Sequence, residues 1–150
     1  MNRRRIDTIP CAVLYDLASG KTLMDTARQQ GYGSIQFYSP VSAADYLGPA
    51  VFAAIHDALA NHDNTMAVTA VFDCGEGTGR ALDAIRQGVQ DISVKADAEC
   101  LRRIHDIARQ SGTRVCPRPD DRDLFDKQDS DPFRLAKAFA TWLGEKQDPT

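Results

Sequence analysis

The chain has 150 residues, of which 43% are hydrophobic and 26% are charged, and its formal net charge at pH 7 is −3. These values are typical of one globular domain, and the longest apolar runs are too short to cross a bilayer. A slightly acidic chain produces no field that attracts a phosphate backbone, which argues against nucleic acid as a partner. We therefore expect a soluble cytoplasmic protein that binds neither nucleic acid nor membranes.

The first ten residues, 1–10, are predicted to form a basic arm before the folded core at 11–116. Their three arginines, Arg3, Arg4 and Arg5, are not followed by the apolar stretch of a secretory signal. The four cysteines follow no metal-binding spacing, so we expect reduced thiols and no metal site. They are Cys11, Cys74, Cys100 and Cys116.

Five short apolar runs predict five strands, most of them buried on both faces of a sheet. They occupy residues 11–15, 34–38, 66–72, 91–96 and 113–116. Helical patterns fill the intervals, which implies parallel pairing through right-handed crossovers. One interval stays open, because residues 21–30 are compatible either with a helix or with the second arm of a hairpin.

Polar and proline residues mark where the helices begin. Ser42 and Asp45 are spaced as in a capping box, and Pro49 is placed as the first residue of a further helix. Thr78 and Asp97 are the predicted N-caps after the third and fourth strands.

Residues 117–131 contain six aspartates, three basic residues and two prolines, and are predicted to be a polar loop or linker. Residues 132–146 then have the pattern of an amphipathic helix, whose apolar stripe must be covered. Either this helix packs back onto the core, or it forms a homodimer or docks on another protein. The residues predicted at a dimer interface are Phe133, Phe139, Trp142 and Leu143.

Five successive βα units predict an α/β fold with an open, mainly parallel five-stranded sheet and helices on both faces. We expect a three-layer sandwich of the flavodoxin-like or Rossmann-like kind. In the flavodoxin-like order, ligands bind between the first and third strands, beyond their carboxyl ends. Asp16 and Asp73 follow these two strands, so they are predicted to converge on one site.

The most distinctive segment is VTAVFDCGEGTGRALDAIRQG, which reads as a strand, a loop and a helix. Gly75, Gly77 and Gly79 allow a ligand to approach the backbone closely, and the start of the helix, with Thr78 and Arg80, favours an anion. The segment completes neither a P-loop nor a dinucleotide-binding motif. A tight structural turn with a capped helix is therefore the alternative to an anion site.

The stretch ALDAIRQGVQDISVKADAECLRRI, with V-K at a strand end, resembles the last part of response-regulator receiver domains. The resemblance implies that Asp73 matches their phosphoryl-accepting aspartate and that Asp16 stands near their metal-binding acidic site. The same stretch is similar to βα units of phosphate-handling barrel enzymes, including aldolases with a Schiff-base lysine. That similarity implies the corresponding role for Lys95.

Three functions remain open. A non-catalytic binding or regulatory domain, with a site for an anionic small molecule at the carboxyl-terminal edge of the sheet, is favoured because every catalytic motif is incomplete. The second is a lyase-like or aldolase-like enzyme acting on a phosphorylated metabolite, with Asp73, Cys74 and Lys95 as catalytic candidates; a helix N-terminus beside Cys74 would favour its thiolate. The third is a structural protein that dimerises through the last helix. The sequence identifies no cofactor.

Overall fold

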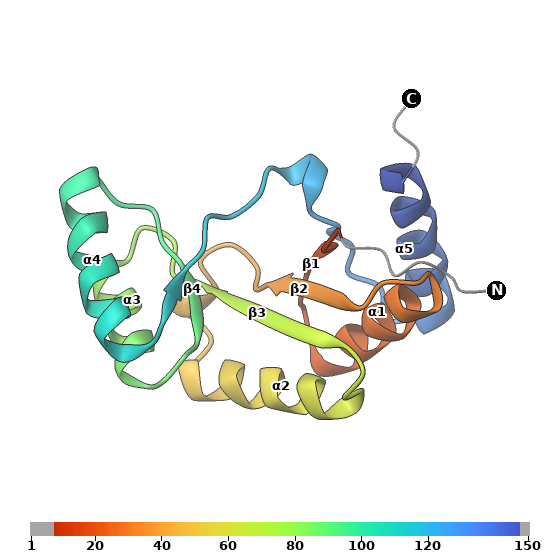
Figure 1. Cartoon of the computed structure of the whole chain (residues 1–150), viewed down its shortest axis with the longest axis horizontal. Helices are drawn as coiled ribbons and strands as arrows, with labels where there is room; N and C mark the ends of the chain where they lie inside the picture. Colours follow the sequence, from red (N-terminus) through yellow and green to blue (C-terminus); the bar gives the residue numbers. More distant parts are fainter. Residues whose placement is uncertain (1–7, 148–150) are drawn as a thin grey trace.

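The structure is a computed structural model that describes residues 8–147, so the arginines of the predicted basic arm lie outside the described residues. Five parallel strands form one open sheet, and successive βα units build it along the chain (Figure 1). The predicted five-stranded parallel α/β fold is confirmed. The strands are β1 (Cys11–Val13), β2 (Ser34–Tyr38), β3 (Ala67–Asp73), β4 (Asp91–Ser93) and β5 (Arg114–Val115). The helices are α1 (Leu17–Gln29), α2 (Pro49–His62), α3 (Thr78–Arg86), α4 (Ala98–Ser111) and α5 (Pro132–Gln147), with two short 3-10 helices, η1 (Ala43–Asp45) and η2 (Asp121–Asp123).

The strands follow one another across the sheet in the order β1-β2-β3-β4-β5. The flavodoxin-like order predicted from the sequence is therefore wrong, because the order never reverses. Strand β2 pairs with β1 on one side and with β3 on the other, so it separates the two strands that were expected to be neighbours. A ligand site at a reversal between β1 and β3 does not exist in this sheet.

Buried apolar residues form two clusters, one on each face of the sheet. The larger cluster packs the inner sides of α1 to α5 against alternate strand residues, such as Phe37 and Phe72. On the opposite face, the segment that follows β5 passes over the strands (Figure 1). Buried residues of all five helices belong to the larger cluster, so the predicted second layer of helices is replaced by this segment, and helices, sheet and segment form three layers. The buried members of the smaller cluster are Val13, Tyr38, Val71 and Leu124.

Residues 21–29 are helical, so the hairpin alternative does not apply. Helix α1 begins where the Asp16 carboxylate accepts a hydrogen bond from the Ser19 N–H at 2.7 Å, completing a capping box. Asp16 therefore serves as a helix cap. Gly20 lets α1 approach its neighbours closely, since a Cβ there would lie 2.8 Å from a Leu14 methyl and 2.9 Å from a Leu59 methyl.

Two helix starts agree with the sequence patterns. Pro49 is the first residue of α2, and the Asp97 carboxylate caps α4 by accepting from the Cys100 N–H at 2.8 Å. Both positions have the residue types that supply a preset φ or a side-chain acceptor.

Two other predicted caps are wrong. Ser42 has a φ of 57° and its side chain caps nothing, so only the single turn η1 follows it. Gly77, not Thr78, occupies the N-cap position of α3, and no side chain caps that helix. Both departures lie in loops at the carboxyl ends of strands, where tertiary contacts decide the backbone conformation.

The predicted polar segment 117–131 is tied to the core near its middle. Val13 N–H donates to the Phe125 carbonyl at 2.8 Å, and Phe125 N–H donates to the Cys11 carbonyl at 2.9 Å, which extends the sheet beyond β1. The Phe125 ring also packs against Phe139 and Trp142 of α5. The outer edge of β1 is thereby covered.

Helix α5 packs on the protein's own core. Of the predicted interface residues, Phe139 and Leu143 are buried, Trp142 is half-buried, and Phe133 is 86% exposed. Among the described helices, none combines the length and the apolar character needed to cross a bilayer.

Candidate functional site

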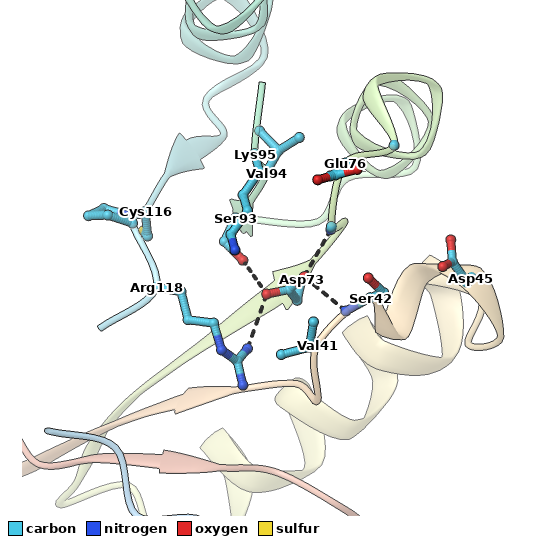
Figure 2. Close-up of a pocket in the computed structure, with 13 residues that line it drawn as sticks. Val41, Ser42, Asp45, Asp73, Glu76, Ser93, Val94, Lys95, Cys116 and Arg118 are labelled. Carbon is cyan, nitrogen blue, oxygen red and sulfur yellow. Dashed lines mark hydrogen bonds and ion pairs between the residues drawn. The ribbon is translucent and has the colours of Figure 1, made fainter. Parts of the chain in front are cut away.

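A cavity of about 550 Å³ lies at the carboxyl ends of β3, β4 and β5 (Figure 2). This size suits a small-molecule ligand. Four loops contribute to its wall, since the chain after β2 runs along the same edge. The polar and charged side chains that line it are Ser42, Asp45, Asp73, Glu76, Ser93, Lys95, Cys116 and Arg118.

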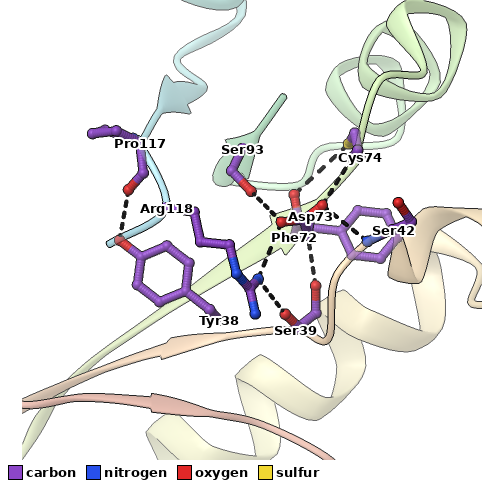
Figure 3. A network of polar contacts seen from close by, with 10 residues as sticks. Tyr38, Ser39, Ser42, Phe72, Asp73, Cys74, Ser93, Pro117 and Arg118 are labelled. Atoms are coloured by element: carbon purple, nitrogen blue, oxygen red, sulfur yellow. Dashed lines mark hydrogen bonds and ion pairs between the residues drawn. The ribbon is translucent and has the colours of Figure 1, made fainter. Parts of the chain in front are cut away.

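Asp73, the last residue of β3, is buried at the floor of this region and accepts four hydrogen bonds (Figure 3). One carboxylate oxygen accepts from the N–H groups of Ser42 at 3.0 Å and Gly75 at 2.8 Å. The other accepts from the Ser93 hydroxyl and from Arg118 Nη1, both at 3.1 Å. These donors come from the loops after β2 and β3, from β4 and from the segment after β5. One carboxylate therefore links four consecutive parts of the carboxyl-terminal edge by hydrogen bonds.

Arg118 is the main residue of the site that the sequence did not reveal. Its Nη1 also donates to the Ser39 carbonyl at 2.8 Å, and its guanidinium lies 5.9 Å from the centre of the Tyr38 ring. The Tyr38 hydroxyl donates in turn to the Pro117 carbonyl at 3.1 Å. Its position in the sequence could have identified it, because Arg118 follows the fifth predicted strand by two residues, and residues directly after parallel strands lie at the ligand-binding edge.

Gly75 is required where two loops meet. Its φ is 57°, and a Cβ on it would lie 2.4 Å from the Ser42 hydroxyl oxygen. The Gly75 carbonyl accepts from the Lys95 N–H at 2.7 Å, which ties the loop after β3 to the chain that leaves β4. The glycine pattern therefore has a structural role in addition to any role in binding.

Lys95 lines the cavity and its side chain is exposed. Within residues 8–147, no carboxylate forms an ion pair with its ammonium group, whereas Arg118 is paired with Asp73. Two further carboxylates, Asp45 and Glu76, line the cavity, and Asp45 lies 3.8 Å from the Arg80 Nε. The site thus contains one unpaired cation among several carboxylates.

Cys74 has the opposite character from the activated thiolate that the enzyme alternative would require. It is buried, and its thiol donates to the Phe72 carbonyl at 3.7 Å. Burial, and then the nearby charge of Asp73, raise the pKa of Cys74 to about 12. Burial and then Asp91 also raise the pKa of Cys116, so both thiols stay protonated near neutral pH.

The structure places some of the predicted site residues together and separates others. Asp73, Gly75, Gly77 and Lys95 line the cavity. Residues 78–80 form the first turn of α3 directly beyond it. Asp16 does not line the cavity, so its predicted convergence with Asp73 does not occur. Among the described residues, no group of three or more His, Cys, Asp or Glu side chains is arranged to hold a metal ion.

No family model matches the chain, and none of the curated proteins matches it either.

Proposed function

We propose that this protein binds a small anionic molecule in the cavity at the carboxyl ends of β3 to β5, and that it acts as a non-catalytic binding or regulatory domain. The observation that carries the proposal is the state of Lys95. Its ammonium group lines a cavity of ligand size and has no ion-pair partner among the described residues, while the neighbouring cation Arg118 is taken by Asp73. A lysine in this position is available to a ligand.

The start of α3 supports the same ligand class. No side chain caps this helix, so the N–H groups of its first turn, at residues 78–80, are open to an acceptor. A helix N-terminus carries a partial positive charge of about half a unit, which favours a phosphate or carboxylate group. Gly79 has open space where a side chain would be, so a ligand is able to approach the backbone there.

The non-catalytic part of the proposal rests on how the other candidates are engaged. Both oxygens of Asp73 accept two hydrogen bonds each, so neither is free to take a proton from a substrate. Cys74 is buried and protonated, so it is not a nucleophile at neutral pH.

Titration calorimetry with inorganic phosphate, glycerol 3-phosphate and citrate tests this function. We expect at least one of these anions to bind, and Lys95→Ala to raise its Kd about tenfold, because a charge-assisted contact is lost. Glu76→Gln should lower the Kd, since an exposed carboxylate on the cavity wall repels the ligand. Lys137→Ala, at an exposed lysine of α5, is the matched control and should change nothing. If none of the three anions binds, or if all the variants bind alike, the proposal is wrong.

A second candidate, Schiff-base chemistry on a phosphorylated carbonyl compound, is favoured by the place of Lys95 two residues beyond the end of β4 in the cavity wall. In that reaction the Lys95 amine adds to the carbonyl carbon and water leaves, giving an imine that borohydride reduces to a stable secondary amine. Incubation with dihydroxyacetone phosphate and borohydride should then increase the mass of the Lys95 peptide by that of the substrate less one oxygen atom, because water leaves and two hydrogens are added. An unmodified Lys95 peptide would remove this candidate and leave the binding proposal intact.

A further inference from the structure

The two edges of the sheet differ in how they are covered. The outer edge of β1 is paired with Phe125, whereas in the described part of the chain no strand pairs with the outer edge of β5. The N–H groups of Arg114 and Cys116 donate inward, to the carbonyls of Gln90 at 2.8 Å and Ile92 at 2.7 Å. Since alternate residues of a parallel strand bond to opposite sides, the N–H and C=O of Val115 point outward.

A groove of about 600 Å³ follows this edge. It is lined by residues 113–117, by His105 and Arg109 of α4, and by Gln36 and Tyr38 of β2. The guanidinium of Arg114 also lines it, and no carboxylate does, in contrast to the cavity beside Lys95. In a chain whose overall charge is −3, this groove is therefore lined by basic side chains and, among the described residues, by no acidic ones.

A buried carboxylate holds Arg114 in place. Asp91, 1% exposed, lies 2.7 Å from the Arg114 Nε, and its Oδ1 also accepts from the Cys116 thiol at 3.7 Å. Its Oδ2 has no hydrogen-bond partner among the described residues. Because the Nε is occupied and the side chain is 70% exposed, the two Nη groups of Arg114 are left for a partner. A guanidinium fixed in this way loses little freedom when it binds an anion.

The basic groups flank the open edge on both faces. Asp91 alternates with Ile92, which belongs to the cluster on the helical face, so Asp91 and its neighbour Arg114 lie on the opposite face. His105 and Arg109 come from α4, a helix that packs in that helical-face cluster through Ile104 and Ala108. Arg109 also lies 3.3 Å from Asp106 of the same helix, an exposed pair that a partner carboxylate would have to share or replace. Side chains on one face of a strand added beside β5 would thus lie near Arg114, and side chains on its other face would lie near Arg109.

We propose that the β5 groove binds an extended acidic segment of a partner protein, which adds to the sheet as a sixth strand. Its backbone would bond to the N–H and C=O of Val115. Carboxylates on its alternate faces would pair with Arg114 on one side and with Arg109 and His105 on the other. A run of consecutive acidic residues meets this requirement, since neighbouring side chains of a strand point to opposite faces. The groove and the Lys95 cavity share Cys116 and Pro117 in their walls, but the proposal does not depend on a ligand in that cavity.

Fluorescence anisotropy with the whole protein and a fluorescein-labelled hexaglutamate peptide tests the proposal. We expect binding that weakens as salt rises, and a hexaglutamine peptide that binds at least tenfold more weakly. Arg114→Gln should raise the Kd about tenfold and Arg109→Gln about threefold. Because Arg114→Gln leaves the buried Asp91 without its cation, Arg109→Gln, at a side chain 79% exposed, gives evidence that does not depend on folding of the first variant.

Arg103→Gln is the matched control, since Arg103 is an exposed arginine of the same helix, paired with Glu99 at 3.0 Å and absent from the groove. It should leave the Kd within twofold of the original value, as should Lys95→Ala. A hexaglutamate peptide methylated at alternate backbone nitrogens should lose binding, because it cannot add as a strand. Equal effects of Arg103→Gln and Arg109→Gln, undiminished binding of the methylated peptide, or tighter binding of a hexauridylate would each overturn the proposal.

Discussion

The ion pair between Asp73 and Arg118 offers the sharpest test of how the carboxyl-terminal edge is held together. The side chains of Asp73 and Arg118 are 7% and 17% exposed, and their closest atoms are 3.1 Å apart. In Asp73→Asn the Oδ1 contacts to Ser42 and Gly75 survive, but an amide group faces the guanidinium. Arg118→Met removes the cation and leaves a buried carboxylate with three donors.

Removing one partner of a buried ion pair costs about 3–5 kcal/mol. Arg118 keeps its bond to the Ser39 carbonyl and some contact with solvent, so we expect the lower end, about 3 kcal/mol, for Asp73→Asn. A similar loss is expected for Arg118→Met. The double variant should lose about 4 kcal/mol instead of the sum of the two, because the second substitution removes a group that is already unpaired.

Guanidinium chloride unfolding, followed by the fluorescence of Trp142, measures these free energies. Trp142 is the single tryptophan and is half-buried in the described structure, so its emission should change on unfolding. Glu99→Gln, which breaks an exposed pair with Arg103, is the control and should cost less than about 0.5 kcal/mol. Losses below about 1 kcal/mol for both single variants, or effects that add to within about 0.5 kcal/mol, would refute the role assigned to this pair.

Three further substitutions test the same edge. Gly75→Ala should lower the free energy of unfolding by about 2 kcal/mol, because its φ is 57° and its new Cβ would lie 2.4 Å from the Ser42 hydroxyl oxygen. Gly79→Ala, where no atom lies within 4 Å of the new Cβ, should be neutral or slightly stabilising; equal losses at the two glycines would contradict this account. Burial raises the pKa of Cys74 from 9.0 to about 12, so its thiol contributes stability that is present below pH 9 and is lost as the pH rises toward 12. Between pH 9 and 10 the free energy of unfolding should therefore fall more steeply in the natural protein than in Cys74→Ala, with a difference in slope of up to about 1.4 kcal/mol per pH unit. Parallel slopes in the two proteins would show that burial does not raise the pKa of this thiol.

The sequence by itself determined the elements and their parallel pairing. Apolar runs separated by helical patterns can bury both faces only in a parallel sheet with crossover helices, so the five βα units were predictable. Local signals at Pro49 and Asp97 also marked helix starts correctly, because caps depend on residues a few positions apart. The position of Asp73 at the carboxyl end of β3 followed from the same pattern.

Only the tertiary structure decided which strands are neighbours and which distant groups meet. The apolar pattern of a strand is the same whichever strand lies beside it, so the consecutive order, and with it the separation of Asp16 from Asp73, could not be read from periodicity. Arg118 lies 45 residues beyond Asp73 in a segment whose composition indicated only a polar loop. Ser42 has the residue type of a helix cap, yet its backbone turns to donate to Asp73. For Arg118 and Ser42 the deciding energy comes from the buried Asp73 carboxylate, which has to be satisfied by whichever donors the fold brings to it, and that requirement is not local in the sequence.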